Sequence, residues 1–228
     1  MKEKIKNEIR IFRSETKPVE YAFWWLCRII MFTVLAEALQ NEDEGYYNLQ
    51  VIVNTVLLFV LPTLHILPRK YFFLARITYR AQTVASFMVI ATCYLGVYKS
   101  LYNETWFYDF FVHFLGGLLC VPAGVYLINA MANGKEKLSP LMGSVAGFGL
   151  SCFTSLGWEC YEFLFDWITG EATQHWYETP FSPFIEMFPT DPMRYPLFDT
   201  MTDLLAGLIG AIIGGTAIRI IYEVKKKK

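Results

Sequence analysis

Three acidic side chains lie close together in residues 157–167, which read GWECYEFLFDW. Glu159, Glu162 and Asp166 are spaced at i, i+3 and i+7, so a helix would place them on one face. The stretch continues a long apolar run, so we expect these carboxylates to belong to a membrane-spanning helix. Carboxylates are costly there unless they are paired, protonated or bound to a cation.

Two further polar pairs occur in other apolar runs of the chain. Asp109 precedes His113 by four residues, and Asp199 precedes Asp203 by the same interval. Residues four apart share one face of a helix, and ionisable side chains in a membrane helix turn toward protein rather than lipid. The motifs therefore predict one shared site, with these candidate metal ligands: Asp109, His113, Glu159, Glu162, Asp199 and Asp203.

With Asp166 included, the motifs hold six carboxylates, which would carry a charge of −6 if all were ionised. Crowded carboxylates at low dielectric cannot all stay ionised without a cation. Either some of them hold protons in a hydrogen-bonded network, or one or two divalent ions bind among them. Carboxylates with one imidazole suit Mg²⁺, Mn²⁺, Ca²⁺ or Zn²⁺. In a metal site, Glu159 or Glu162 would be the catalytic base, and His113 would move a proton.

The composition indicates that these motifs belong to a membrane protein. Of 228 residues, 54% are hydrophobic and 18% are charged, which is less charge than a soluble domain carries. Several apolar runs approach the roughly 20 residues that cross a hydrocarbon core of ~30 Å. We expect an all-α fold of six transmembrane helices with both termini cytoplasmic. The expected spans are residues 21–39, 49–67, 81–98, 106–130, 140–168 and 197–222.

The distribution of cations predicts the orientation. With both ends inside, 18 of the 20 Lys and Arg residues fall on the cytoplasmic side, and Lys99 and Arg194 fall outside. The asymmetry predicts a multi-pass protein of the plasma (inner) membrane, with membrane lipids as its partners. Arg28 lies about two turns into the first span, from where its long side chain can reach the interface. No basic stretch is interleaved with aromatics, which argues against nucleic acid as a partner.

The expected organisation is one membrane domain between two basic tails. Residues 1–20 form a basic cytoplasmic tail, which is either a helix on the lipid surface or a solvated segment. Residues 21–222 form the six-span domain, with the polar-site core in about 106–222. Residues 171–196 combine five prolines with many aromatics, which predicts a lid on the outer surface. Residues 223–228 form a basic C-terminal tail.

The three motifs are expected at one depth in the membrane. At 1.5 Å per residue, Asp109 and His113 lie roughly 5–10 Å below the outer entry of their span, and Asp199 and Asp203 roughly 3–9 Å below theirs. Glu159 lies ~28 Å above the inner face, so it also reaches the outer leaflet. The spacing leaves open whether the site includes three further residues: Asp166, His175 and Arg194.

Small residues in the last three spans predict close packing of those helices. They are Gly116 and Gly117, the pair Gly143-x-x-x-Gly147, and the pair Gly210-x-x-x-Gly214. Such spacing lets two helix backbones approach closely in a membrane. Close packing would bring the three polar motifs together.

The motifs also resemble those of a known family. Asp109-x-x-x-His113 with the small residues after it resembles the D-K-x-x-H-F element of YjdF-like inner-membrane proteins, which is itself similar to that of VanZ-like proteins. Glu159-x-x-Glu162 resembles their E-x-x-E, and Asp199-Thr200-x-x-Asp203 their D-T-x-x-D. The likeness covers about residues 105–216. It implies a polytopic membrane family and supports the site residues, but it implies no activity.

Three functions are compatible with this pattern. The first is an enzyme that acts on a lipid or an envelope glycolipid at the outer leaflet. The second is a proton- or cation-coupled transporter that uses the acids as its coupling site. The third is a non-catalytic accessory protein with a protonated carboxyl network. The sequence does not decide whether the protein is an enzyme, and it predicts no oligomeric state.

Overall fold

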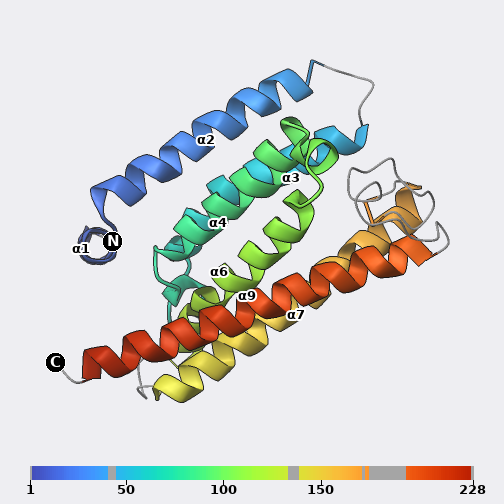
Figure 1. The fold of residues 1–228 in the computed structure, drawn as a ribbon. Helices are drawn as coiled ribbons and strands as arrows, with labels where there is room; N and C mark the ends of the chain where they lie inside the picture. The colour runs from blue at the N-terminus through green and yellow to red at the C-terminus, as the bar shows by residue number, and fades with distance from the viewer. Residues whose placement is uncertain (1, 41–44, 133–138, 171–172, 175–193, 227–228) are drawn as a thin grey trace. The chain divides into compact units, whose positions relative to one another are not determined.

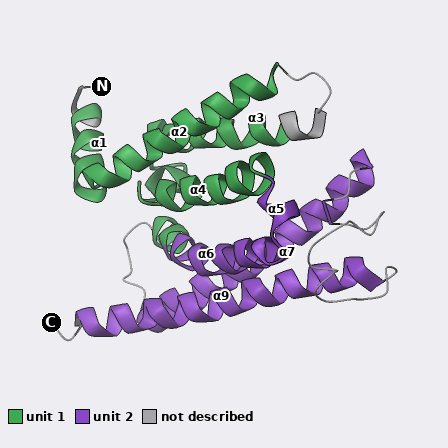
Figure 2. Cartoon of the chain, turned by 45° about the horizontal axis from the view of Figure 1, so that its top comes forward, with its two compact units in different colours: residues 1–99, 126–137 green, residues 100–125, 138–228 purple. Residues whose placement is uncertain are grey.

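A computed structural model describes residues 2–40, 45–132, 139–170, 173–174 and 194–226 (Figure 1). Every regular element in these ranges is a helix. The chain divides into two compact units, which are coloured separately in Figure 2. Unit 1 comprises residues 1–99 and 126–137, and unit 2 comprises residues 100–125 and 138–228.

Six helical segments among the described residues are long and apolar enough to cross a membrane, which confirms the predicted fold class. Their ends differ from the predicted ends by at most three residues. The largest differences are at the start of the first segment, which is residue 18 where 21 was predicted, and at the end of the last, which is residue 225 where 222 was predicted. The six segments are Pro18–Ala38, Leu49–Ile66, Ala81–Tyr98, Tyr108–Ala132, Pro140–Thr169 and Tyr195–Lys225.

Unit 1 packs the first three membrane segments around one apolar core. Its elements are α1 (Lys2–Glu15), α2 (Pro18–Ala38), α3 (Gly45–Val60), the 3₁₀ helices η1 (Leu61–Ile66) and η2 (Phe73–Arg76), α4 (Ala81–Val89) and the π-helix η3 (Ile90–Tyr98). The α-helical pattern gives way to η1 next to Pro62, because proline cannot donate the backbone hydrogen bond that would continue it. Cys27, Met31, Val51 and Leu58 lie in the core.

Arg28 does not reach the interface as the sequence predicted. Its side chain is buried, with Nε donating to the carbonyl oxygen of Leu58 at 3.1 Å and Nη2 donating to Oε1 of Gln82 at 3.0 Å. A buried charge must be hydrogen-bonded to be tolerated, and these two neighbouring helices supply the acceptors. Arg28 therefore links α2 to α3 and α4.

The N-terminal helix α1 is attached to unit 1 through its acidic residues. Arg69 makes two hydrogen bonds of 2.8 Å to the Glu8 carboxylate. Glu15 Oε2 accepts hydrogen bonds from Thr78 Oγ1 at 2.8 Å and from the backbone N–H of Tyr79 at 2.9 Å. These contacts fix α1 against the segment that leads into α4.

Unit 2 consists of α5 (Leu101–Glu104), the first part of α6 (Tyr108–Ala132), α7 (Pro140–Thr169) and α9 (Tyr195–Lys226). Ser139 caps α7 by accepting a hydrogen bond from the N–H of Met142, and Pro140 occupies the first turn, where no backbone donor is needed. Gly170 ends the helix with φ of +77°, a conformation that glycine adopts without strain. α7 and α9 run side by side in Figure 1.

Glycines bring the backbones of α6, α7 and α9 close together. A Cβ added to Gly117 of α6 would clash with the carbonyl oxygen of Gly207 of α9. A Cβ added to Gly147 of α7 would lie 2.5 Å from the carbonyl oxygen of Val121. Ser151 Oγ adds a hydrogen bond of 2.5 Å to the carbonyl oxygen of Gly117.

The glycine pairs predicted from the sequence contribute unequally. Added Cβ atoms at Gly210 and Gly214 would each meet the backbone of α6 within 2.8 Å, so that pair forms a contact as predicted. A Cβ at Gly143 would meet no described residue within 4 Å, so within the described ranges Gly147 alone of the α7 pair forms the contact. Spacing identifies such pairs, but it does not say which member faces the neighbouring helix.

This difference gives a matched pair of substitutions. Gly117→Ala should destabilise the protein by about 1–3 kcal/mol, because the added methyl group would push α6 away from α9. Gly143→Ala should be neutral or stabilise slightly, by up to about 1 kcal/mol, since alanine favours helix and meets no neighbour. Thermal melting of both variants in detergent measures the effect. Equal melting temperatures would contradict the glycine contact.

Candidate functional site

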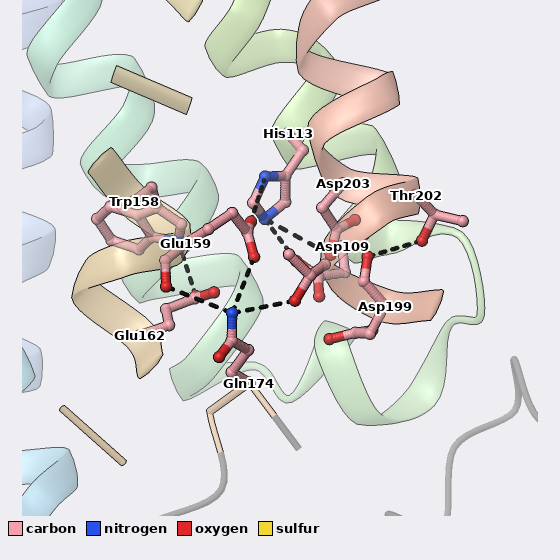
Figure 3. Close-up of polar contacts among 10 residues, drawn as sticks. Asp109, His113, Trp158, Glu159, Glu162, Gln174, Asp199, Thr202 and Asp203 are labelled. Carbon is pink, nitrogen blue, oxygen red and sulfur yellow. Dashed lines mark hydrogen bonds and ion pairs between the residues drawn. The ribbon is translucent and has the colours of Figure 1, made fainter. Parts of the chain in front are cut away.

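The candidate site is centred on His113, a buried residue of α6. Its Nε2 atom lies 3.5 Å from Asp109 Oδ1 of the same helix and 4.0 Å from Asp203 Oδ2 of α9. Its Nδ1 atom lies 3.5 Å from Glu159 Oε1 of α7. Figure 3 shows these carboxylates turned toward the imidazole ring. Side chains from three helices of unit 2 therefore meet around one histidine.

The glycine contacts explain why these side chains meet. Each central residue of the site lies one helical turn from a close contact between α6, α7 and α9, since residues four apart share a face. A Cβ added to Gly207 would lie 2.6 Å from Ser155 Oγ of α7, which extends the contact between Gly117 and Gly207 to the third helix. The corresponding pairs are His113 with Gly117, Asp203 with Gly207, and Glu159 with Ser155.

Two groups of side chains in the described part of the chain could hold a metal ion. One is Asp109, His113 and Asp203, and the other is His113, Glu159 and Glu162. Within each group, one ligand atom from every residue lies within 4.8 Å of the others. His113 belongs to both groups. Asp199 belongs to neither and lies one turn before Asp203 on α9, so its role as a ligand stays a prediction.

Glu159 is the most enclosed carboxylate of the cluster, with only 4% of its surface exposed. Its Oε2 atom accepts a hydrogen bond of 3.3 Å from Gln174 Nε2. Its Oε1 atom is buried and makes no hydrogen bond within the described residues. A buried acceptor without a donor costs free energy, so this oxygen calls for a proton or a cation.

Gln174 is a site residue that the sequence pattern did not reveal. Its Nε2 atom donates to the side chain and to the carbonyl oxygen of Glu159, both at 3.3 Å, and to Thr200 Oγ1 at 3.0 Å. Gln174 belongs to the predicted lid, residues 171–196. Most of that lid, including His175, lies outside the described residues. The lid itself therefore stays a prediction, and the contact that Gln174 makes with Glu159 is what the structure describes of this region at the site.

Asp166, whose place in the site the spacing left open, binds the backbone beyond the end of α7. It is fully buried, and its carboxylate accepts hydrogen bonds from the backbone N–H groups of Thr173 at 2.8 Å and Gln174 at 2.7 Å. The hydroxyl of Thr173 donates to the same carboxylate. Asp166 therefore holds the chain beyond α7 in place and positions Gln174 beside Glu159, without joining the groups around His113.

Two more residues, Trp158 and Tyr102, border the site. Trp158 Nε1 donates a hydrogen bond of 2.7 Å to Glu162 Oε1, one turn along α7. Burial raises the pKa of the Tyr102 phenol, and the charges of Asp109 and Glu162 raise it further, so the phenol is protonated at neutral pH. Arg194, which the sequence left open as a site residue, is exposed directly before α9.

A family comparison covers most of the chain. The family described as predicted membrane protein (DUF2238) matches residues 22–223. The chain belongs to this family. The DUF2238 match spans the six membrane segments almost completely and includes every residue of the cluster around His113. Searches of the curated proteins and of the solved structures return no match.

The DUF2238 description supports a membrane protein and names no activity.

Four residues at the site were not predicted from the sequence: Gln174, Thr200, Trp158 and Tyr102. Trp158 could have been found, because it precedes Glu162 by four residues on one helix. Gln174 carried no such signal, since it lies in an aperiodic segment whose position depends on Asp166.

The hydrogen bonds of Asp166 lead to a test by hydrogen exchange. In Asp166→Ala, the amides of Thr173 and Gln174 should exchange about tenfold faster or more, because both lose a buried charged acceptor. Glu223→Ala removes an exposed carboxylate of α9 and should leave those amides unchanged. Exchange followed by mass spectrometry over residues 170–174 reports the difference. Unchanged exchange in Asp166→Ala would show that Asp166 does not hold this segment.

Proposed function

We propose that the protein is a metal-dependent enzyme of the plasma (inner) membrane that acts on a lipid or an envelope glycolipid at the outer leaflet. The observation that supports it most is the convergence of carboxylates from α6, α7 and α9 on His113, with Glu159 Oε1 buried and without a hydrogen bond among the described residues. Intramembrane ionisable clusters are expensive, and they are functional by default.

The donor atoms around His113 fit a divalent cation. Carboxylate oxygens with one imidazole nitrogen suit Mg²⁺, Mn²⁺, Ca²⁺ or Zn²⁺. His113 with Asp109 and Asp203, or with Glu159 and Glu162, would hold the ion. When bound, such an ion supplies Lewis acidity toward an ester or phosphoryl oxygen and makes a bound water more acidic.

The chain's own residues would provide the proton transfers. Glu159 or Glu162 accepts a proton from the attacking water or hydroxyl group, and His113 transfers a proton to the leaving group. Gln174 keeps the Glu159 carboxylate oriented through its hydrogen bond to Oε2. Trp158 does the same for Glu162 through its indole N–H. Fixed partners of this kind limit the reorganisation that the reaction requires.

The outer-leaflet position rests on orientation and depth. The asymmetry of Lys and Arg predicts that both termini lie in the cytoplasm. Asp109 and His113 then lie in the first turns of α6, and Asp199 and Asp203 in the first turns of α9, near the outer ends of both helices. A site at this level meets lipid headgroups, which is why a lipid or a glycolipid is the proposed substrate class.

We also propose that the chain is a YjdF-like protein. The three motifs that carry the resemblance contain every residue of the two groups around His113. Phe110 stands where a lysine is common in the D-K-x-x-H-F element. Without that lysine, the cluster has one cation fewer to balance its carboxylates, which strengthens the case for a bound metal ion.

Elemental analysis of detergent-purified protein tests the metal site. The wild type should retain about one equivalent of a divalent metal through dialysis, and Glu159→Gln/Asp203→Asn should lose at least about 90% of it, because one carboxylate is removed from each group. Glu223→Gln, an exposed carboxylate of α9, is the matched control and should retain the metal. Equal metal content in all three proteins would overturn the proposed site.

The same variants separate an enzyme from the two alternatives. A metal-binding wild type that changes the lipid profile of its host cells, while Glu159→Gln does not, would support the enzyme. Uptake into proteoliposomes that depends on a proton or cation gradient would indicate the transporter instead. A host phenotype that survives simultaneous neutralisation of Asp199 and Asp203 would indicate the accessory protein.

A further inference from the structure

A cavity of about 440 Å³ lies in unit 1, whereas the residues around His113 belong to unit 2. The cavity is bordered by the end of α1, by the segment from the end of η2 to the start of α4, and by the last part of α6, which belongs to unit 1. Its polar lining includes Ser14, Glu15, Arg76, Thr78, Arg80 and Asn129. Ligand pockets in proteins span roughly 300–1,000 Å³, so this cavity can hold a small organic molecule.

Hydrogen bonds within the wall hold the cavity in shape. Glu15 Oε2 accepts hydrogen bonds from Thr78 Oγ1 and from the backbone N–H of Tyr79, at 2.8 and 2.9 Å. Arg80 Nε donates to the carbonyl oxygen of Glu15 at 2.8 Å. The carboxylate of Glu15 is thus already engaged by donors of the wall, and the end of α1 is fixed beside both arginines.

Arg76 is the group that calls for a ligand. Its Nε atom is buried and makes no hydrogen bond within the described residues. A buried donor without an acceptor costs free energy, and the cost is larger for a charged group. The lining carries two guanidinium groups against one carboxylate, so it has a net positive charge. A planar guanidinium presents a fork of donors that matches two oxygens of a phosphate group.

We propose that this cavity binds a phosphate-bearing anion, with Arg76 and Arg80 as its charged ligands. Ser14 and Asn129 supply further polar contacts from two other elements of the lining. The volume exceeds what a bare phosphate ion needs, so the ligand carries an organic group. The anion is either the headgroup of an anionic phospholipid or a water-soluble phosphomonoester, because both present the same oxygens to the arginines.

The surroundings are compatible with a lipid source. Phe72, Phe73 and Leu74 lie two to four residues before Arg76 in the sequence and are exposed. Aromatic and aliphatic side chains next to basic residues mark the level of the headgroups in a membrane. Acyl chains could lie against these residues while the phosphate occupies the cavity.

The experiment compares both sources on the full-length protein. Native mass spectrometry of the protein from nanodiscs measures retained phosphatidylglycerol against phosphatidylcholine. Glycerol 3-phosphate and inorganic phosphate are then added as soluble competitors. The variants are Arg76→Gln and Arg80→Gln, with Arg10→Gln as the matched control, because Arg10 is an exposed arginine of α1 whose hydrogen bond goes to Asn7.

The wild type and Arg10→Gln should retain phosphatidylglycerol equally, and each cavity variant should bind about tenfold to a hundredfold more weakly, the loss expected for one charge-assisted hydrogen bond. Displacement by glycerol 3-phosphate would identify a soluble phosphomonoester as the ligand. Its failure to displace the lipid would identify the lipid headgroup.

A further variant, Asn129→Trp, tests the cavity independently in case the arginine variants misfold. Asn129 is exposed and lines the cavity, so Asn129→Trp should obstruct the cavity while leaving both arginines in place. Loss of binding in a folded Asn129→Trp protein supports the proposal. Wild-type binding in Asn129→Trp and in both arginine variants, or no preference of the wild type for any of the anions, overturns it.

Discussion

The close approach of α6, α7 and α9 is the contact on which the candidate site depends. Apolar side chains gain little from leaving lipid for a helix interface, so membrane helices associate through close packing and hydrogen bonds. Here the packing is backbone against backbone, with Gly117 facing Gly207 and Gly147 facing Val121, and Ser151 adds a hydrogen bond to Gly117. One turn away, the same faces carry His113, Glu159 and Asp203. Because these backbones are in close contact, the polar side chains on the packed faces can avoid the lipid only by pointing toward one another.

The cost of this arrangement is electrostatic. Carboxylates from three helices surround one imidazole, and the Oε1 atom of Glu159 is buried and makes no hydrogen bond within the described residues. A bound divalent cation would remove the repulsion between the carboxylates and would satisfy that oxygen, whereas shared protons would remove the repulsion by neutralising the acids. The supporting hydrogen bonds from Gln174 and Trp158 fix two of the carboxylates, as is common for ligands of metal sites.

Hydrophobic runs and helical periodicity were enough to predict the six membrane segments and the residues that meet around His113. Periodicity left open whether Asp166 joins the site, because seven residues advance a helix by about 10 Å. Its carboxylate turns to the backbone after Gly170. Arg28 was expected at the interface. It is buried instead, because it finds acceptors on α3 and α4, and the sequence alone does not show that these lie beside it. Gln174 and the cavity beside Arg76 depend on contacts between distant segments, and local patterns do not encode those.

We propose that a divalent ion binds to the imidazole of His113 and to carboxylates of neighbouring helices. Pulsed electron paramagnetic resonance of Mn²⁺-loaded protein tests this directly, because a coordinated imidazole nitrogen modulates the echo. The account predicts a ¹⁴N modulation in the wild type and in His65→Gln, and its loss in His113→Gln. Failure of the protein to bind Mn²⁺, or a ¹⁴N modulation that persists in His113→Gln, would contradict it.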